Sequence, residues 1–295
     1  MNPMFVGAAT ALVTPMTDGG VNLAAWDRLL DFQLAEGIAG LVVTGTTGEP
    51  STLSLEEKAA LWKAAIAKSG GRVPVIAGTG GNDTKKVVRE SHIAAECGAD
   101  ALLIVTPYYN YNKPTPRGLI AHYRAVAEVG LPIIVYNVPA RTGLNLTPDL
   151  LAHLCDIPQV TALKEASGNI NQMTALAERF ADRLTLYCGE DAIILPAMSL
   201  GYRGVISVIS NLLPRQTNQL VLDYEGGDIA AARAAQFAMN PLVSLLFCEV
   251  SPGPAKTALR AMGHDMGPLR LPLDEMDPAN AARLRDCMTK MGLCQ

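Results

Sequence analysis

The stretch Val160-Thr161-Ala162-Leu163-Lys164-Glu165 is a short apolar run that ends in an amine. Lys164 is the one lysine of nine that ends a strand-like run, because the other eight lie in helix-like or loop-like polar segments. Side chains alternate along a strand, so Val160, Ala162 and Lys164 are expected to share one face. The small side chain of Ala162 then leaves space beside the amine.

An amine with an ordinary pKa of about 10.4 is protonated near neutral pH and cannot act as a nucleophile. Burial in an apolar site can lower that pKa by about three units, which corresponds to roughly 4 kcal/mol. A nucleophilic Lys164 is therefore one interpretation. The other is that Lys164 pairs with a carboxylate such as Glu165 or Glu190, or extends past the strand end to solvent. The strand by itself leaves both open.

Similar apolar runs recur along the chain and alternate with helix-like segments. They are apolar on both faces, which is typical of parallel strands covered by helices. The predicted strands are residues 7–13, 40–44, 73–77, 101–106, 132–136, 160–164, 184–188 and 204–208. The predicted helices are residues 24–36, 55–68, 84–97, 117–129, 148–154, 170–180, 192–200 and 213–225, and Ser54 with Glu57 forms a capping box.

Eight such units predict an α/β fold, a (β/α)8 TIM barrel over residues 1–227 that carries the catalytic site. Residues 228–295 contain helix-like segments without strands, at 229–239, 242–250, 255–262 and 278–291, and we expect a C-terminal helical extension packed on the barrel. A doubly wound open sheet is the alternative. It normally brings a glycine-rich dinucleotide turn after the first strand, and residues 14–20 contain no such turn.

Composition describes a compact soluble protein, with 49% apolar and 18% charged residues. A net charge of -4 offers no basic field for nucleic acid or an anionic membrane. The first 26 residues lack Lys and Arg, and the apolar runs noted here are shorter than the ~20 residues that cross a bilayer, so we expect a cytoplasmic location. The six cysteines and four histidines lack metal-ligand spacing, so we expect neither metal nor cofactor.

Active sites of TIM barrels lie at the carboxyl ends of the strands. The second predicted strand is followed by Gly45-Thr46-Thr47-Gly48-Glu49, which is either a simple tight turn or a set of backbone amides that holds a carboxylate. The fourth is followed by residues 107–114 with three tyrosines, a loop that also suits an interface. The seventh ends in Gly189-Glu190-Asp191.

The fifth predicted strand ends in Tyr136-Asn137-Val138-Pro139-Ala140-Arg141-Thr142-Gly143. A phenol at a strand end can donate or accept a proton, and a guanidinium suits a carboxylate through bidentate bonds.

The third predicted strand is followed by a glycine-rich segment, Gly78-Thr79-Gly80-Gly81-Asn82, which resembles a phosphate loop. Asp83 stands where such a loop needs its last glycine, so we interpret the segment as a turn.

Taken together, these motifs strongly resemble the dihydrodipicolinate synthase (4-hydroxy-tetrahydrodipicolinate synthase) family of Schiff-base pyruvate aldolases and lyases. The likeness runs from the first strand to the end of the barrel and more weakly into the tail. The motifs are Gly45-Thr46-Thr47-Gly48-Glu49, Ala77-Gly78-Thr79-Gly80, Thr106-Pro107-Tyr108-Tyr109-Asn110, Tyr136 to Gly143, Leu163-Lys164-Glu165-Ala166-Ser167-Gly168-Asn169 and Gly204-Val205-Ile206-Ser207.

The resemblance implies a Schiff base between Lys164 and pyruvate, condensation with L-aspartate 4-semialdehyde, and 4-hydroxy-tetrahydrodipicolinate as product, on the route to diaminopimelate and lysine. It further implies a homotetramer of two tight dimers. A proton relay would run through Tyr136, Thr46 and Tyr109, the last from a neighbouring subunit. The implied substrate-binding residues are Thr47 and the backbone near Ile206 for the pyruvate carboxylate, Arg141 for the second substrate, and Gly189.

Two departures from the family pattern concern the tail and the effector cleft. Ser251-Pro252-Gly253-Pro254-Ala255-Lys256 stands where the family usually has Asn-Pro-x-Pro-Val-Lys. In lysine-inhibited members the cleft lies near positions that match Asn82 and Tyr108, which are retained. Lys86 stands where a carboxylate usually pairs with the effector amine, and Lys58 replaces a histidine. Cations there would repel a cationic effector, so we expect weak or absent lysine feedback.

Two other functions compete with this one. Sister pyruvate-dependent aldolases, acting on N-acetylneuraminate or keto-deoxy sugar acids, share the lysine and the tyrosine. Arg141 in its Val-Pro-Ala-Arg-Thr-Gly setting favours aspartate semialdehyde instead. A non-catalytic keto-acid sensor on the same barrel would not need Lys164, Tyr136, Thr46 and Tyr109 together, because binding alone requires no proton relay.

Overall fold

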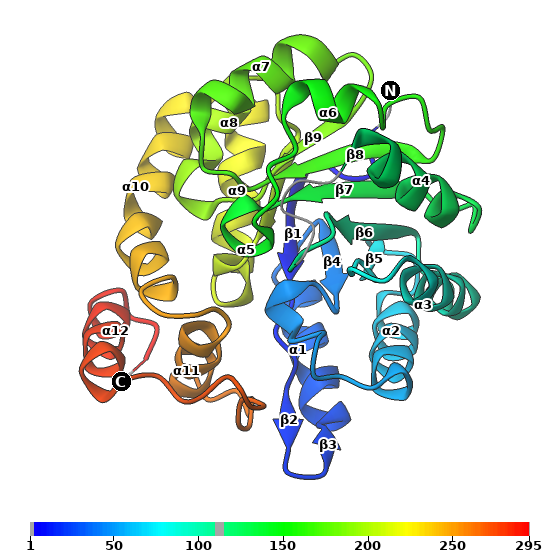
Figure 1. Ribbon diagram of the computed structural model, residues 1–295. Helices are drawn as coiled ribbons and strands as arrows, with labels where there is room; N and C mark the ends of the chain where they lie inside the picture. The colour runs from blue at the N-terminus through cyan, green and yellow to red at the C-terminus, as the bar shows by residue number, and fades with distance from the viewer. Residues whose placement is uncertain (1–2, 110–114, 295) are drawn as a thin grey trace.

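A closed barrel of eight parallel strands forms the centre of the molecule (Figure 1). The computed structural model describes residues 3–109 and 115–294. Around the barrel the strands run in the order β1-β10-β9-β8-β7-β6-β5-β4, and β4 pairs with β1. They are β1 (Gly7–Ala11), β4 (Gly40–Val43), β5 (Val75–Gly78), β6 (Ala101–Val105), β7 (Ile133–Asn137), β8 (Val160–Glu165), β9 (Thr185–Cys188) and β10 (Gly204–Ser207). The predicted (β/α)8 barrel is confirmed.

Helices cover the outside of the barrel. They are α1 (Leu23–Ala35), α2 (Leu55–Ser69), α3 (Thr84–Cys97), α4 (Pro116–Ala127), α5 (Pro139–Thr142), α6 (Pro148–Ala152), α7 (Ile170–Phe180), α8 (Ile194–Ser199) and α9 (Pro214–Glu225), with the 3-10 turns η1 (Thr46–Gly48), η2 (Asp191–Ile193) and η3 (Ile209–Asn211). The predicted capping box is present at the start of α2, where Ser54 and Glu57 bond reciprocally. The short hairpin β2 (Met16–Thr17) and β3 (Gly20–Val21) was not predicted, because two-residue strands carry no periodicity.

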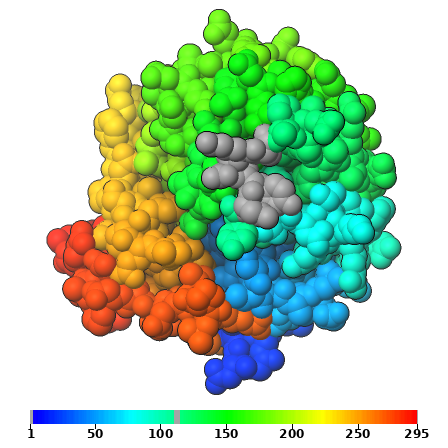
Figure 2. All heavy atoms as spheres, viewed as in Figure 1, coloured from blue at the N-terminus to red at the C-terminus, as the bar shows by residue number. Residues whose placement is uncertain are grey.

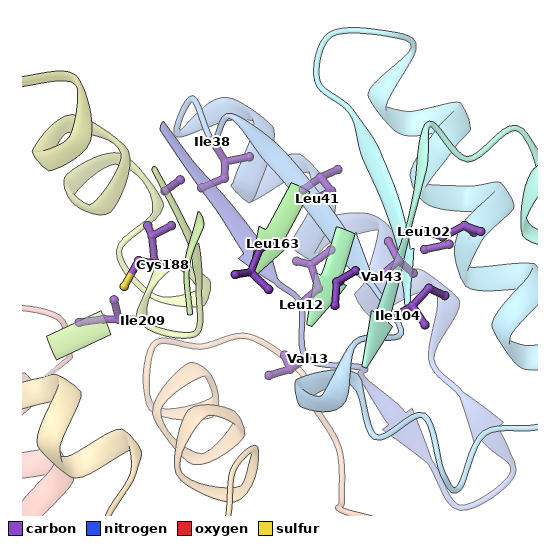
Figure 3. Packing of buried hydrophobic residues seen from close by; sticks show 14 of the residues in the cluster. Leu12, Val13, Ile38, Leu41, Val43, Leu102, Ile104, Leu163, Cys188 and Ile209 are labelled. Carbon is purple, nitrogen blue, oxygen red and sulfur yellow. The ribbon is translucent and has the colours of Figure 1, made fainter. Parts of the chain in front are cut away.

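Two groups of buried apolar side chains fill the barrel and its surroundings. The larger one lies between the strands and the helices, and Figure 3 shows part of it, including Leu41, Leu102 and Leu163. The smaller group consists of side chains that alternate along the strands with those of the larger group, among them Ala162 and Ile206. Val160 belongs to the larger group, so the prediction that it shares a face with Lys164 is wrong. The pairing of β7 with β8 shifts register between Val160 and Ala162, which breaks the alternation.

The chain after α9 forms α10 (Ile229–Leu246), α11 (Gly253–Ala261) and α12 (Pro278–Lys290), which lie along one side of the barrel (Figure 1). The prediction of two helices at 229–239 and 242–250 is wrong, because α10 continues through Pro241. Proline removes the hydrogen bond to the carbonyl four residues earlier, here Phe237. Phe237 is 65% exposed, so that carbonyl lies on the side of α10 that faces solvent.

Among the described helices, α10 is the one that is long and apolar enough to cross a membrane by length and composition alone. A single helix of this kind is weak evidence for a membrane span. In this structure α10 packs against α9 and α12 and buries six side chains. It serves here as a packing helix between the barrel and the end of the chain.

Candidate active site

Lys164 and Tyr136 lie side by side at the carboxyl ends of two neighbouring strands. They are register partners in the pairing of β8 with β7, and the Lys164 Nζ atom lies 4.2 Å from the centroid of the Tyr136 ring. Gly189 follows β9, and a Cβ atom added there would lie 3.1 Å from Lys164 Cε. Ile206 on β10 belongs to the same inner group of side chains as Tyr136. The barrel therefore brings these four predicted residues together.

The amine of Lys164 is buried and has no carboxylate partner in the described part of the chain. Its side chain is about 5% exposed, and burial lowers its pKa to about 8, against the opposing charges of Asp191 and Glu190. The ion-pair interpretation of Lys164 is therefore wrong. A pKa of about 8 leaves roughly one molecule in ten with a neutral amine at pH 7.

Glu165, the nearest carboxylate in sequence, faces away from the amine. Its Oε2 accepts a hydrogen bond from Asn137 Nδ2 at 2.9 Å, and its Oε1 accepts one from the backbone amide of Ser167 at 2.9 Å. The Glu190 carboxyl is partly buried, and burial together with the charge of Asp191 raises its pKa. Desolvation, not an ion pair, is thus what makes the Lys164 amine available.

The Tyr136 phenol keeps its proton at neutral pH. Burial raises the pKa of Tyr136 to about 12, while the nearby charge of Arg141 and the Thr46 side chain oppose that rise. Tyr136 and Thr46 line the same cavity. A phenol and a hydroxyl that share a cavity can exchange a proton with each other or with a bound substrate.

Thr46 and Thr47 sit on η1, the 3-10 turn between β4 and α2. Thr47 is buried and Thr46 is half-buried. The residues that flank this turn, Thr44 and Glu49, have positive φ angles of 56° and 57°. L-residues seldom adopt that backbone, and it concentrates at functional sites. The two positive φ angles therefore favour a functional role for this turn over that of a simple connection between β4 and α2.

A cavity of about 330 Å³ opens in front of these side chains. Thr46, Tyr136 and Arg141 line it, and Arg141 is exposed to solvent. The predicted residues Lys164, Thr47, Gly189 and Ile206 do not line it. Lys164 instead contacts Tyr136, one of the cavity residues, with its amine 4.2 Å from the ring centroid.

The C-terminal extension supplies part of the cavity wall, which the sequence reasoning missed. The residues from this extension are Val250, Ser251, Pro272 and Leu273. In Figure 2 the orange surface of this segment lies against the blue surface of the barrel. The atypical Ser251 to Lys256 segment therefore lies at the site.

A buried ion pair between the barrel and the extension was also missed. Glu49 Oε1 and Lys256 Nζ are 3.0 Å apart, and neither side chain is exposed. The sequence placed Lys256 in polar surroundings, and that prediction is wrong. The one sequence feature that pointed to Glu49 was its place at the end of the Gly-Thr-Thr-Gly-Glu motif. No sequence feature pointed to its partner, because Lys256 is 207 residues away.

Tyr109 lies apart from the residues described above. It is 87% exposed, has a φ of 75°, and does not line the cavity of its own chain. The rest of the predicted tyrosine loop, residues 110–114, lies outside the described residues. Within residues 3–109 and 115–294, no three His, Cys, Asp or Glu side chains gather as a metal ligand set.

A second, smaller cavity of about 50 Å³ lies where the resemblance placed the effector cleft. Lys58, Asn82, Lys86, Glu90 and Tyr108 line it. Lys58 Nζ lies 2.8 Å from Glu90 Oε2, and Lys86 Nζ lies 3.8 Å from Glu90 Oε1. Two lysines thus share one carboxylate at this position.

The fold and the buried amine at a strand end define a TIM barrel equipped for Schiff-base chemistry, and comparison with known proteins agrees. The model of the Dihydrodipicolinate synthetase family matches residues 4–291, and the chain belongs to that family. A curated relative, 4-hydroxy-tetrahydrodipicolinate synthase of Thermoanaerobacter sp. (strain X514), is 44% identical over 293 residues, which cover 99% of this chain and 98% of the relative.

Solved structures of the same family superpose closely on this one. Dihydrodipicolinate synthase from Thermotoga maritima is 37% identical, with a TM-score of 0.95 over 99% of this chain and 100% of that one. A structure described as the first monomeric dihydrodipicolinate synthase variant is also 37% identical, with a TM-score of 0.95 and coverage of 98% of each chain.

Proposed function

We propose that this protein condenses pyruvate with L-aspartate 4-semialdehyde to give 4-hydroxy-tetrahydrodipicolinate, on the route to diaminopimelate and lysine. The single observation that carries the proposal is the buried Lys164 amine, without a carboxylate partner among the described residues and with a pKa of about 8, beside the Tyr136 phenol. Family membership supports the choice of the two substrates.

The first half of the reaction uses Lys164 as the nucleophile. Its neutral amine attacks the carbonyl carbon of pyruvate, the carbonyl oxygen leaves as water, and a protonated imine forms. The imine accepts electrons as the methyl group loses a proton, so an enamine forms. In this proposal Tyr136 and Thr46 carry the protons, since they line the same cavity and the Tyr136 pKa of about 12 keeps the phenol protonated.

The pyruvate carboxylate is assigned to Thr47 and the backbone near Ile206, and Gly189 is assigned to substrate binding. The missing side chain at Gly189 supports its role, because a Cβ atom there would crowd both Ala166 Cβ at 2.6 Å and Lys164 Cε at 3.1 Å. A larger residue would take the space into which the imine must turn.

The acceptor carboxylate is assigned to Arg141. Its exposed guanidinium lines the cavity in front of Tyr136, where a second substrate reaches the enamine after pyruvate is bound. The competing function is another pyruvate-dependent aldolase that takes a sugar-derived aldehyde. A sugar-derived aldehyde has no carboxylate for the Arg141 guanidinium to bind. Arg141 therefore favours aspartate semialdehyde as the acceptor.

The assembly is proposed to be a homotetramer of two tight dimers in the cytoplasm. The exposure of Tyr109 supports the dimer, since a side chain that leaves its own barrel can reach a neighbour's site. Sedimentation and activity measured over the same dilution series test this. A fully active monomer would contradict the Tyr109 assignment.

The test of the proposed function is reductive trapping. Borohydride added with pyruvate reduces the imine to a secondary amine, so intact mass rises by about 72 Da if Lys164 forms the Schiff base. The Lys164→Arg variant serves as the control and must not gain this mass. No adduct on the native chain would contradict the proposal. Aspartate semialdehyde is then added to ask whether condensation follows, which a keto-acid sensor would not support.

A further inference from the structure

The turn that carries Thr46 and Thr47 is held at both ends in an unfavourable backbone conformation. Thr44 and Glu49 bracket it with φ angles of 56° and 57°. Among the described residues, only Tyr109 shares this feature without being glycine. Such a backbone persists only where the surrounding structure holds it. The contacts of these two residues therefore indicate what fixes the turn.

The first end of the turn is fixed from within the barrel. Trp62 Nε1 donates a hydrogen bond to Thr44 Oγ1 at 2.8 Å, and that hydroxyl donates to the carbonyl of Gly78 at 3.0 Å. The hydroxyl of Thr14 donates to the carbonyl of Gly48 at 2.8 Å. These contacts come from residues near the turn in the fold, and they hold Thr44 before the turn and Gly48 as its last residue.

The second end is fixed from the C-terminal extension. Glu49 Oε1 accepts from Lys256 Nζ at 3.0 Å, and Oε2 accepts from the backbone amide of Arg270 at 3.1 Å. Lys256 Nζ also donates to the carbonyl of Pro268 at 2.6 Å. Both charged side chains have no exposed surface, so water cannot replace either partner.

This arrangement connects the ion pair to the reacting groups through the backbone. The amide of Glu49 donates to the carbonyl of Thr46 at 3.2 Å, which closes the turn. The amide and the hydroxyl of Thr52 also hold the carbonyl of Glu49, at 3.2 and 3.1 Å. Loss of the side-chain partner therefore loosens the connection between Glu49 and the extension, and we expect the carbonyl of Thr46 to shift with it. Ser251 and Leu273 of the extension line the same cavity as Thr46.

We propose that the Glu49–Lys256 ion pair is a positioning device that holds the hydroxyls of Thr46 and Thr47 at the reacting centre. Lys256 does not line the cavity, and Glu49 lines it without any exposed side-chain surface. The pair links the extension to the turn, so the extension is part of what makes the site competent. This inference rests on the roles proposed above for Thr46 and Thr47.

The test measures borohydride trapping by pyruvate in the Lys256→Met variant. Lys164 belongs to β8 and not to the turn, so trapping at saturating pyruvate is expected to reach the native level. The pyruvate concentration for half-maximal trapping is expected to rise at least about tenfold, because Thr47 no longer holds the carboxylate. The kcat for condensation is expected to fall about tenfold or more through Thr46.

Lys58→Met is the matched control, because Lys58 and Glu90 form another buried Lys–Glu pair, between α2 and α3. We expect it to lower the unfolding temperature, by less than Lys256→Met does because Glu90 keeps Lys86 at 3.8 Å, while pyruvate half-saturation stays within about twofold of native. Native half-saturation in a folded Lys256→Met variant would overturn the proposal. An equal rise of half-saturation in both would also overturn it, since any lost ion pair would then have that effect.

Glu49→Gln provides the same test if Lys256→Met does not fold. The amide oxygen can still accept from the backbone of Arg270, whereas the NH2 group that replaces the other oxygen cannot accept from Lys256, so the ion pair is lost with little change of shape. Half-saturation is expected to rise at least about threefold, and a native value overturns the proposal. Failure of the proposed function is distinguishable, because the native chain itself would then give no pyruvate adduct.

Discussion

The Lys164 amine faces the ring of Tyr136, 4.2 Å from its centroid, and not a carboxylate. The pair combines a base that is partly neutral at pH 7 with a phenol that stays protonated, and burial causes both effects. A carboxylate beside Lys164 would raise its pKa and keep the amine charged. The aromatic neighbour therefore supports nucleophilic chemistry while stabilising the cationic imine that follows.

The pH dependence of imine formation follows from the lowered pKa of Lys164. The neutral amine is the reactive form, so kcat/KM for pyruvate is expected to rise about tenfold per pH unit below 8 and to level off above that value. Initial rates between about pH 6 and 9 measure this. A rate that is flat across that range would contradict a buried amine as nucleophile.

Lys164 should also destabilise the fold. Its pKa falls from 10.5 to about 8 on folding, so burial of the charge costs about 3 kcal/mol below pH 8, and the cost vanishes as pH rises through 10.5. Lys164→Met is expected to raise unfolding stability at pH 7 by up to that amount and by much less at pH 10.5. Urea unfolding at both pH values checks this, and an equal effect at both would contradict it.

Removal of the Tyr136 hydroxyl should separate binding from proton transfer. In Tyr136→Phe the ring still packs against Lys164, but the hydroxyl that faces the cavity with Thr46 is lost. We expect kcat for condensation to fall between about 100-fold and 10,000-fold. Slow borohydride trapping with pyruvate should still reach completion. Full kcat in this variant would remove Tyr136 from the proton relay.

Arg141→Ala should affect the second substrate alone. We expect the KM for aspartate semialdehyde to rise at least about tenfold, as the loss of a charge-assisted bond predicts. The half-saturating pyruvate concentration should not change, since Arg141 lies at the exposed front of the cavity. An unchanged KM for the semialdehyde would instead favour another pyruvate-dependent aldolase.

Lysine is expected to inhibit weakly or not at all. Lys58 and Lys86 both lie against the carboxylate of Glu90 beside a cavity of only about 50 Å³, and the other carboxylate that lines it, Asp83, accepts from the backbone amides of Lys85 and Lys86. An effector amine would therefore meet the positive charges of two lysines while both carboxylates already have partners. A cationic effector would be repelled. Steady-state assays with added lysine measure this. Half-maximal inhibition below about 1 mM would show that the cleft accommodates the effector despite that charge.

Much of the barrel could be predicted from sequence because its strands are buried on both faces and lie in separate apolar runs. The candidate site residues Lys164, Tyr136, Gly189 and Ile206, which the barrel brings together, could be named because each lies in a short motif at a strand end. The register shift that turns Val160 outward could not, since it depends on how β7 pairs with β8. The path of α10 through Pro241 depends on packing against α9 and α12.

The pairing of Glu49 with Lys256 was also beyond sequence reasoning. The two residues are 207 positions apart, and each alone resembles an ordinary surface charge. Only the closed barrel and the folded extension show that both are buried. The same holds for Ser251 and Leu273, which become cavity residues through the course of the tail.

The distance between Glu49 and Lys256 along the chain also sets an order of events during synthesis. At about 5–20 residues per second, a ribosome needs roughly 10–40 s to travel from the first residue to the second. Every strand of the barrel has been made before Lys256 is translated. A nascent chain stalled before that point should therefore hold a barrel whose active-site turn is anchored at its first end but not by the extension, and full activity should appear only near termination.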